Sequence, residues 1–295
     1  INTRNEEKYI ADCLESLSWV DEIVVVDMES SDKTTDICYR FTKNVFKHKF
    51  LPYVEPARNF GLKQATGDWI ILLDPDERIP HALAAKLIQI VKEDAVNFVR
   101  IPRKNIIFDH PMHHSRWWPD YNVRFFKKGK VEWQNAIHRP PLTLGEGLTL
   151  PEDEELAIVH YNYTSILEYF DKFHRYAAIT ARQLQNDGYK FDWTDLLKRP
   201  FSEFLSRFFA GQGYKDGLHG LVISLLQAFQ EMTIYLLVWE KQGFTPENGR
   251  PFIDSLIQSF RKLQHEFNYW LTTLLIENAS KKTAKFWLRL KRRFV

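Results

Sequence analysis

Two unbroken apolar runs constrain the fold of the first half of this sequence. Residues 23–26 (IVVV) lead into Asp27, and residues 69–73 (WIILL) lead into Asp74. A short apolar run bounded by polar residues predicts a strand buried on both faces, as in a parallel sheet covered by helices. Further strands are expected at 45–48, 98–101 and 123–127, and helices at 6–20, 34–42, 56–66 and 80–92. This alternation predicts an α/β domain with a Rossmann-like, mostly parallel, doubly wound sheet, whose ligands bind at the carboxyl ends of the strands.

The second half of the sequence has helical patterns and almost no strand pattern. Helices are expected at 165–185, 200–210, 218–239 and 251–277. A connection rich in proline, glycine and acidic residues covers 140–155, so we expect an α/β domain at 1–155 and a helical domain at 156–295. The apolar stretch 220–239 carries Glu231 near its centre, and a carboxylate there would cost roughly 2.5–3.5 kcal/mol in a bilayer. We therefore expect a buried core helix rather than a membrane span.

The net charge of +2 is the sum of two unequal parts. The chain has 40 basic and 38 acidic residues, but residues 280–295 contain seven basic residues and no acidic one. The near-zero total argues against nucleic acid as a partner of the whole chain. The remaining body is slightly acidic, and binding of nucleic acid through the tail alone is a further alternative. In the tail, Phe286 and Trp287 lie among the cations, which predicts a basic amphipathic helix on an anionic membrane surface, at roughly 1 kcal/mol per cation. A solvated charged terminus is the alternative.

Acidic residues follow both apolar runs, where the sheet would present them to a ligand. Asp74 and Asp76 are two residues apart on a turn, and paired carboxylates of this kind bind Mg²⁺ or Mn²⁺. A plain Asp-Pro-Asp turn is the alternative. Asp27 either accepts hydrogen bonds from a nucleoside or caps its own turn. Arg58 stands at an expected helix start, where a cation is unfavourable unless an anion such as a diphosphate lies nearby.

Three separated segments together resemble family 2 glycosyltransferases of the GT-A fold. INTRNEEKYIADCLESL, VVVDMESSDKTTDI and PARNFGLKQATGDWIILLDPDERIP occur in that family's order and spacing, and the resemblance covers about residues 1–140. The later segments HYNYTSILEYFDKFHRY and FFAGQGYKDGLHGLVISLLQAFQEMTIYLLVWEK resemble the helical extension of bacterial members. Those members add sugars to lipopolysaccharide core or related surface glycans.

The resemblance implies a role for each of the acidic turns. Asp74 and Asp76 would be the metal-binding DxD pair that holds the diphosphate of a nucleotide sugar through Mg²⁺ or Mn²⁺, with Arg58 on the diphosphate. The uridine-type nucleoside would be contacted by Thr3, Asn5, Glu6 and Asp27. His138 and His160 follow strand-like segments that the family brings back to the donor site, and each would be a metal ligand, a contact of the diphosphate or a structural histidine. The QxxRW motif of processive synthases is absent, so the resemblance implies inverting transfer of a single sugar, with a UDP-sugar as donor and a saccharide or lipid-linked glycan as acceptor.

The general base of such a transfer stays open. Relatives frequently have a glutamate after Val-His, and Arg139 stands at that position here, so the usual base is missing. Asp120 is the favoured candidate and Glu132 is the second. The histidines of the 110–114 loop suggest zinc or, more simply, a solvated loop. The aromatic residues near these positions could form a sugar-stacking acceptor platform or belong to the core; they are Trp117, Trp118 and Trp133.

The expected protein is therefore a glycosyltransferase of the hexosyltransferase class. With only two cysteines, it suits the reducing cytoplasm, and the tail places it peripherally on the inner face of the cell membrane. Self-association of the helical domain is a further option. The alternatives are a non-catalytic scaffold of the same fold and a nucleotidyltransferase, which would usually have glycines that residues 2–7 lack. The chain opens at Ile1 without methionine, and we expect residues upstream of it.

Overall fold

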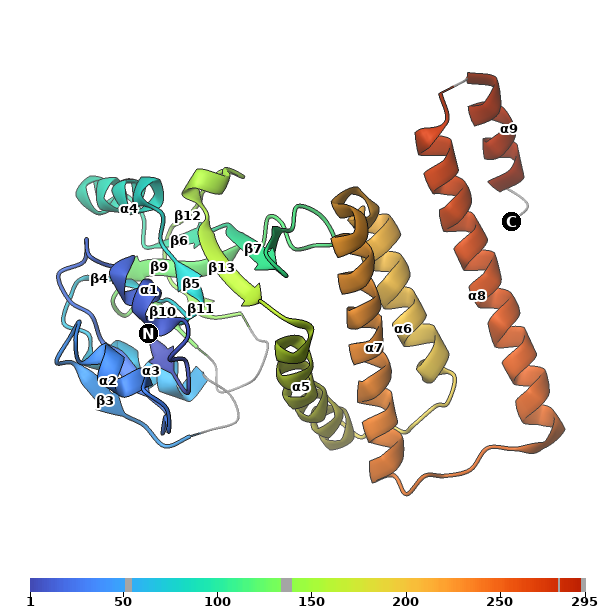
Figure 1. The fold of residues 1–295 in the computed structure, drawn as a ribbon, viewed down its shortest axis with the longest axis horizontal. Helices are drawn as coiled ribbons and strands as arrows, with labels where there is room; N and C mark the ends of the chain where they lie inside the picture. Colours follow the sequence, from blue (N-terminus) through green and yellow to red (C-terminus); the bar gives the residue numbers. More distant parts are fainter. Residues whose placement is uncertain (51–54, 134–139, 281, 293–295) are drawn as a thin grey trace. The chain divides into compact units, whose positions relative to one another are not determined.

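The computed structural model describes residues 1–50, 55–133, 140–280 and 282–292, and the chain divides into two compact units (Figure 1). The α/β unit consists of residues 1–111 and 117–162, and the helical unit of residues 112–116 and 163–295. The division falls later than residue 155, the end of the α/β domain that the sequence suggested. The reason is strand β13 (Ile158–Tyr163), which still pairs with β5 (Glu77–Arg78) of the α/β unit.

The first sheet of the α/β unit is parallel and has helices on both faces. Its strands, in spatial order, are β1 (Asn2–Thr3), β2 (Val25–Asp27) and β3 (Val45–Lys47). Its helices are α1 (Ile10–Glu15), α2 (Thr34–Cys38) and α3 (Glu55–Gln64). Ile10 and Leu14 of α1 bury one face together with Val25. On the other face, Val26 packs against Ala57 of α3. Adjacent strand residues point to opposite faces, which is why an unbroken apolar run suits this sheet.

The second sheet contains both parallel and antiparallel pairs. It has the order β12 (Gly147–Thr149), β6 (Phe98–Ile101), β9 (Asn122–Lys127) and β4 (Trp69–Ile71), with β9 antiparallel to both neighbours. Beside β5 and β13, the third contains β7 (Arg103–Ile107) and β8 (His110–Pro111), and β10 (Val131–Glu132) pairs with β11 (Leu142–Thr143). Helix α4 (His81–Glu93) inserts Leu83, Leu87 and Ile90 into the core. The predicted class, α/β with parallel strands followed by helices, is confirmed, but the antiparallel β9 was not foreseen.

Five long helices form most of the helical unit. They are α5 (Ile166–Asn186), α6 (Asp195–Leu205), α7 (Gly217–Lys241), α8 (Gly249–Asn278) and α9 (Lys282–Arg292). Helix α7 packs against α5 and α6, and α9 folds back along α8. The predicted helices agree closely with α5, α7 and α8. The sequence suggested Pro200 as a helix start, because proline favours the first helical turn. Helix α6 instead begins five residues earlier, at Asp195.

Helix α7 packs its two sides differently. Ile223, Ile234 and Val238 are buried, whereas Leu218 and Leu225 are exposed. Among the described residues, Gly213–Lys241 is the one helical stretch long and apolar enough to cross a membrane, and 28% of its most apolar window is buried. Core helices of soluble proteins satisfy the same criteria of length and composition. The sequence predicted a buried helix here, and the structure buries one side of it and leaves another side exposed.

A five-residue loop of the α/β chain, 112–116, belongs to the helical unit. The Ser115 amide donates to the Gly211 carbonyl over 2.8 Å, and the Asp216 carboxylate accepts from the amides of His113 and His114. A Cβ at Gly213 would lie 2.2 Å from the Ser115 hydroxyl, so only glycine allows this approach. The glycine-rich turn between α6 and α7 therefore binds this loop through hydrogen bonds and a close approach at Gly213. The His114 ring also lies at the start of α7, with Nδ1 2.8 Å from Asp216 Oδ1.

Candidate active site

Buried polar side chains gather at the carboxyl ends of β1 and β2. Thr3 is 1% exposed and Asp27 is 2% exposed, although both are polar. The Asp27 carboxylate accepts from the Ser30 amide at 3.2 and 3.4 Å, which is the turn-capping contact foreseen as its alternative role. Within the described residues, Asn2 Oδ1 and Thr3 Oγ1 are buried without a hydrogen-bond partner. Unpaired buried polar atoms are costly and need an explanation, and a bound ligand is one.

Asn5 and Glu6 join the loop after β1 to the loop after β2. Asn5 Oδ1 accepts from the Ser31 amide over 2.8 Å, and the Asn5 amide donates to the Ser30 hydroxyl over 2.9 Å. The Glu6 amide donates to Thr34 Oγ1 over 2.7 Å. Asn5 has a φ of 55°, which asparagine tolerates better than most residues. Both residues therefore shape the rim of the sheet edge, and their proposed contacts to a nucleoside stay predictions.

Asp74, three residues beyond β4, is held by two arginines. Its carboxylate accepts from Arg58 Nη2 at 3.0 and 3.2 Å and from Arg124 Nη2 at 2.6 Å. Burial alone would raise the pKa of this carboxyl, but the two guanidinium groups hold the pKa well below its ordinary value. Asp74 is therefore ionised. Arg58 lies on α3, which packs against β1 and β2, so it connects the two strand ends that the sequence singled out.

Asp76 faces His160 across a short gap that suits a cation. Asp76 Oδ2 lies 3.5 Å from His160 Nε2, and His160 Nδ1 lies 2.7 Å from Asn105 Oδ1. The Asn105 amide nitrogen donates to the Trp117 carbonyl over 2.8 Å, which fixes Oδ1 as the atom facing the ring. His160 Nδ1 is therefore the donor. In a neutral ring, the lone pair of Nε2 then points at a carboxylate, and a proton or a divalent metal between them relieves the repulsion.

These two side chains fit a divalent cation as part of its ligand set. Mg²⁺ and Mn²⁺ accept carboxylate oxygen or imidazole nitrogen and keep other positions for water and phosphate oxygens. Over the described ranges, no group of three or more acidic, histidine or cysteine side chains is arranged to hold a metal. The protein would thus contribute Asp76 and His160, while the Asp74 oxygens already accept from arginines.

Four residues of this site were missed by the sequence reasoning. They are Glu77, Arg103, Asn105 and Arg124. Glu77 is fully buried, and its Oε1 accepts from Arg103 Nη1 at 3.1 Å and from Arg124 Nη2 at 2.9 Å. Its Oε2 accepts from the Asp74 amide at 2.9 Å, which fixes the turn between the two aspartates. The available signal was the third acid of the Asp-Pro-Asp-Glu turn. Arg103 begins β7 beside Lys104 and Asn105, so its sequence context gave no such signal.

The linked ion pairs leave one negative charge in excess. Among the described residues, the carboxylates of Asp74, Glu77 and Asp120 pair with three guanidinium groups, those of Arg58, Arg103 and Arg124. Asp76, which faces His160, adds a fourth carboxylate. A bound divalent cation would make the net charge of these side chains and the cation positive. The cluster would then favour a diphosphate, whose oxygens pair well with guanidinium and metal.

The two candidate bases lie in different surroundings. Asp120 Oδ2 accepts from Arg103 Nε at 2.8 Å and Nη2 at 2.5 Å, and the Asp120 side chain is 28% exposed. Burial raises the pKa of Asp120, but Arg103 outweighs this and lowers it overall, which weakens Asp120 as a base. Glu132 is exposed on β10 between buried Val131 and Trp133. The assignment of the base stays a prediction; His138 and Arg139 lie outside the described residues.

The expected aromatic platform is only partly available. Trp133 is 6% exposed and packs on Phe126 at 5.6 Å between ring centroids. Its backbone is clamped by Asn59, which donates to the Trp133 carbonyl and accepts from its amide. Trp133 is therefore a core residue, as its alternative role foresaw. Trp117 and Trp118 are partly exposed, so their contact with an acceptor remains a prediction.

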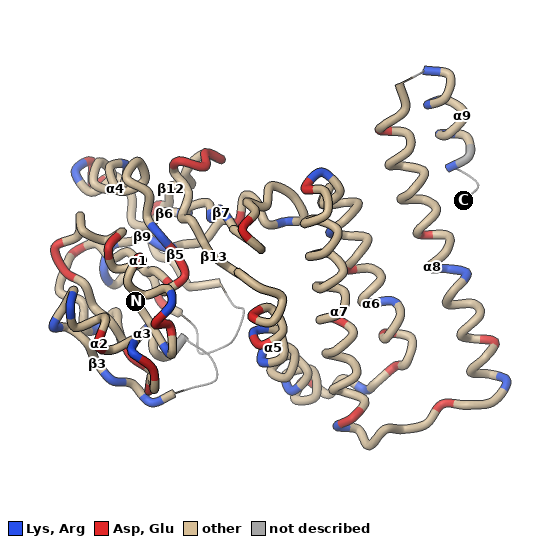
Figure 2. The backbone as a smooth tube through the Cα atoms, in the orientation of Figure 1, with Lys and Arg blue, Asp and Glu red and all other residues tan. Residues whose placement is uncertain are grey.

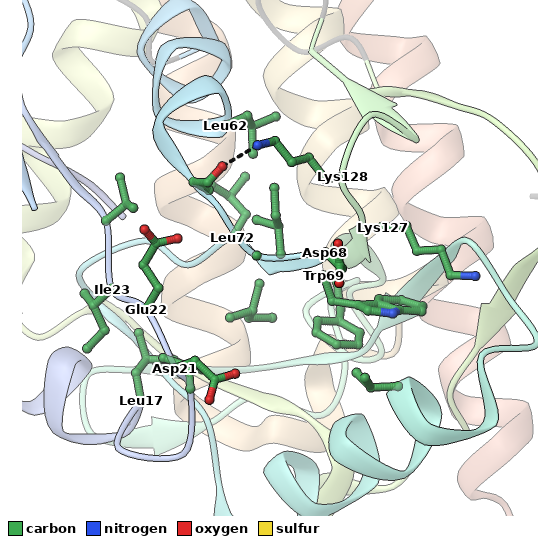
Figure 3. A pocket seen from close by; sticks show the side chains of 18 of the residues that line it. Leu17, Asp21, Glu22, Ile23, Leu62, Asp68, Trp69, Leu72, Lys127 and Lys128 are labelled. Carbon is green, nitrogen blue, oxygen red and sulfur yellow. Dashed lines mark hydrogen bonds between the residues drawn. The ribbon is translucent and has the colours of Figure 1, made fainter.

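A large cavity of the α/β unit lies at the other end of β4. It has a volume of about 960 Å³ and is bordered by Asp68 and Trp69 at the start of that strand (Figure 3). Lys128 crosses its rim and donates to the Ala65 carbonyl over 2.5 Å. Of the residues assigned to the site from sequence, Arg58 alone borders this cavity. Its size therefore gives no reason to move the active site away from the carboxyl end of β4.

Comparison with known proteins identifies the class. Residues 1–142 match the model described as Glycosyl transferase family 2. A Rickettsia typhi protein described as an uncharacterized glycosyltransferase (RT0209) is 26% identical over 242 residues, which cover 78% of this chain and 82% of that protein. The lipopolysaccharide core biosynthesis glycosyltransferase LpsC of Rhizobium meliloti is 23% identical over 265 residues, covering 86% of this chain and 94% of LpsC.

Solved structures of S. aureus TarS are also similar to the chain. The alignment with a TarS structure has 17% identity and a TM-score of 0.39, and covers 80% of this chain and 49% of that one. The TarS 1–349 fragment in complex with UDP gives 16% identity and a TM-score of 0.39, covering 84% of this chain and 91% of the fragment.

The protein is therefore an enzyme of the glycosyltransferase class. Residues 1–142 belong to glycosyltransferase family 2. This result decides against the nucleotidyltransferase alternative. It also places the buried ion-pair cluster and the acidic turn inside the family domain.

Proposed function

We propose that the chain transfers one sugar, with inversion, from a UDP-sugar to a saccharide or lipid-linked glycan acceptor. The observation that carries the proposal is the pair Asp76 and His160, which face each other at 3.5 Å beside the arginine-bound Asp74. A nucleotide sugar has a nucleoside and a diphosphate, and the sheet edge offers groups for both. The lipopolysaccharide assignment of LpsC supports a bacterial surface glycan as the acceptor.

Each end of the donor has its own set of residues. The nucleoside would lie against Thr3 and Asp27, at the edge where buried polar atoms have no partner within the described residues. The diphosphate would lie at Arg58, whose Nε is buried and likewise unpartnered. Asp76 and His160 would hold Mg²⁺ or Mn²⁺, which supplies charge neutralisation of the diphosphate when bound.

The protein's own residues would drive the transfer by charge and position. Arg58 donates to the departing diphosphate, whose negative charge grows as the bond to the sugar breaks. On the acceptor side, a carboxylate takes the proton of the attacking hydroxyl. We assign this step to Asp120, because Arg103 and Asn105 fix its orientation. Among the described residues, its Oδ1 accepts from the neutral side-chain amide of Asn122 rather than from a cation.

A screen of nucleotide sugars tests the donor class. We expect UDP-sugars to bind at least about tenfold more tightly than GDP-, CMP- or dTDP-sugars, and only with Mg²⁺ or Mn²⁺ present. Isothermal titration of the full chain measures the affinities, and release of UDP measures turnover. Equal binding of all donors, or binding that is unaffected by a chelator, would contradict the proposed nucleoside and metal contacts.

Helix α9 is proposed to hold the enzyme on an anionic membrane surface. Figure 2 shows basic positions and no acidic ones along α9. Phe286 is 60% exposed and Trp287 is 68% exposed, and exposed Lys282 and Arg289 flank them. Arg292 instead lies over the Tyr269 ring of α8, which ties the helix to its unit. Exposed aromatics flanked by cations are typical of interfacial helices.

Vesicle binding tests this contact. The double substitution Phe286→Ser and Trp287→Ser should lower binding to vesicles containing phosphatidylglycerol at least about tenfold, because it removes the buried apolar part of the contact. Sedimentation with vesicles measures the bound fraction. Leu167→Ser, at an exposed apolar position of α5, is the matched control and should bind normally. Equal binding of the native chain to neutral and anionic vesicles would refute the electrostatic contribution of the tail.

A further inference from the structure

An apolar stripe runs along one side of helix α8. Its residues occur at steps of four, three, four, three and four from 253 to 271, with one further position a turn beyond. They are Ile253, Ile257, Phe260, Gln264, Phe267, Leu271 and Leu275, and all are exposed. The six apolar members are between 37% and 54% exposed. Alternating steps of four and three keep residues on a narrow seam of a helix, the spacing by which two helices pair in a coiled coil.

Other sides of α8 already have partners within the helical unit. Phe209, in the turn after α6, stacks on Trp270 at 6.2 Å between ring centroids. On another side, Arg292 of α9 donates to Thr273 over 3.2 Å. Figure 1 shows α9 alongside the C-terminal part of α8. The stripe lies beside these contacts and stays exposed to solvent. At its edge, Phe267 also packs on Phe209 at 6.0 Å and on Phe201 at 6.4 Å between ring centroids, but remains 37% exposed.

The charge of α8 makes a lipid surface the weaker partner for this face. Helix α8 has three basic residues, Arg250, Arg261 and Lys262, and three acidic residues, Asp254, Glu266 and Glu277. It is therefore neutral, unlike α9, and gains nothing from anionic lipid. A seam this narrow is also typical of helix pairing, whereas membrane-surface helices have a broader apolar face.

The area of the stripe is sufficient for a dimer. Half-exposed side chains of this size leave roughly 80–100 Å² each, so the six apolar residues expose about 500 Å² per copy. A symmetric pair would bury about 1,000 Å² in total, which is the lower bound for a specific interface. Two copies of one chain present the same seam to each other, which a two-fold interface requires.

Gln264 selects the direction of the pairing. In a parallel pair, each seam residue meets its own copy, so Gln264 meets Gln264 and each amide both donates and accepts. In an antiparallel pair, the amide would face Phe260 or Phe267 and lose its hydrogen bonds to water without replacement. We propose that α8 forms a parallel, two-fold coiled coil with α8 of a second copy of this chain, with Gln264 paired to itself.

Paired charge variants at residue 264 test this arrangement. In sedimentation velocity, the full chain should run at about twice its mass of 35.1 kDa. Gln264→Glu alone and Gln264→Lys alone should each weaken the dimer at least about tenfold, because like charges meet at one layer. An equimolar mixture of the two variants should restore the dimer, since opposite charges then meet. Lys262→Glu, exposed on the opposite side of α8, is the matched control and should remain dimeric.

The outcomes separate the competing arrangements. A native chain that is monomeric at tens of micromolar overturns the proposal. Failure of the mixed variants to restore a dimer, while Phe260→Glu dissociates the native one, overturns the parallel register. A monomeric chain whose vesicle binding is lost in Phe260→Glu assigns the stripe to lipid instead. Circular dichroism of each variant shows that the helices persist, and because residues 260 and 264 are exposed, their substitution leaves the core intact.

Discussion

Asp76→Asn is expected to lower sugar transfer about a thousandfold while leaving the free energy of unfolding nearly unchanged. The substitution removes the carboxylate charge that faces His160 Nε2 at 3.5 Å, and with it an anionic ligand for the cation that neutralises the diphosphate. The side chain keeps its shape, and Asp76 is not among the fully buried residues, so packing is little affected. Turnover is measured as UDP release, and binding by titration of UDP with and without Mn²⁺.

The matched control for Asp76→Asn is Asp21→Asn. Asp21 is an exposed carboxylate that borders the 960 Å³ cavity at the opposite end of the strands. If the site lies at the carboxyl end of β4, the control keeps its activity and its Mn²⁺-dependent UDP binding. Undiminished transfer by Asp76→Asn would refute the metal assignment. Loss of transfer in the Asp21 variant would instead place the donor in the cavity.

The strand ends could be foreseen because the signals for them are local. The apolar run before Asp27 can bury all of its side chains only in the interior of a sheet. The strand at 98–101 was likewise predicted with the bounds that the structure has. Strands β5, β7 and β8 were not foreseen, because they are two to five residues long and are rich in polar residues, as in Glu77–Arg78. Their pairing depends on partners far away in the chain, such as Val159 with Arg78.

The ion-pair cluster was hidden for the same reason. Arg124 reaches Glu77 across 47 positions of sequence, and Arg103 reaches it across 26. Nothing within a short window distinguishes these arginines from surface ones. The sequence could show that Asp74 and Asp76 share a turn. It could not show that arginines bind the first of them, which depends on β9 lying antiparallel beside β4.

Glu77→Ala is expected to lower the free energy of unfolding by about 3–5 kcal/mol, the largest stability effect expected in the cluster. Glu77 is fully buried and accepts from both Arg103 and Arg124, which would be left as buried cations with less countercharge. Its Oε2 also holds the amide of Asp74, so the metal turn loses its support. Urea unfolding followed by tryptophan fluorescence measures the change in stability.

The control for Glu77→Ala is Glu93→Ala, which removes an exposed carboxylate bonded to Gln89 and should change the unfolding free energy by no more than about 0.5 kcal/mol. Because the helical unit can unfold separately, only the transition of the α/β unit is compared. Glu77→Gln keeps the volume and one acceptor oxygen of the side chain. Its decrease in unfolding free energy should therefore lie between those of the two alanine variants. If the unfolding free energy of Glu77→Ala lies within about 1 kcal/mol of that of the native chain, Arg103 and Arg124 are not held by this carboxylate. Such a result would mean that water compensates the two arginines in place of Glu77.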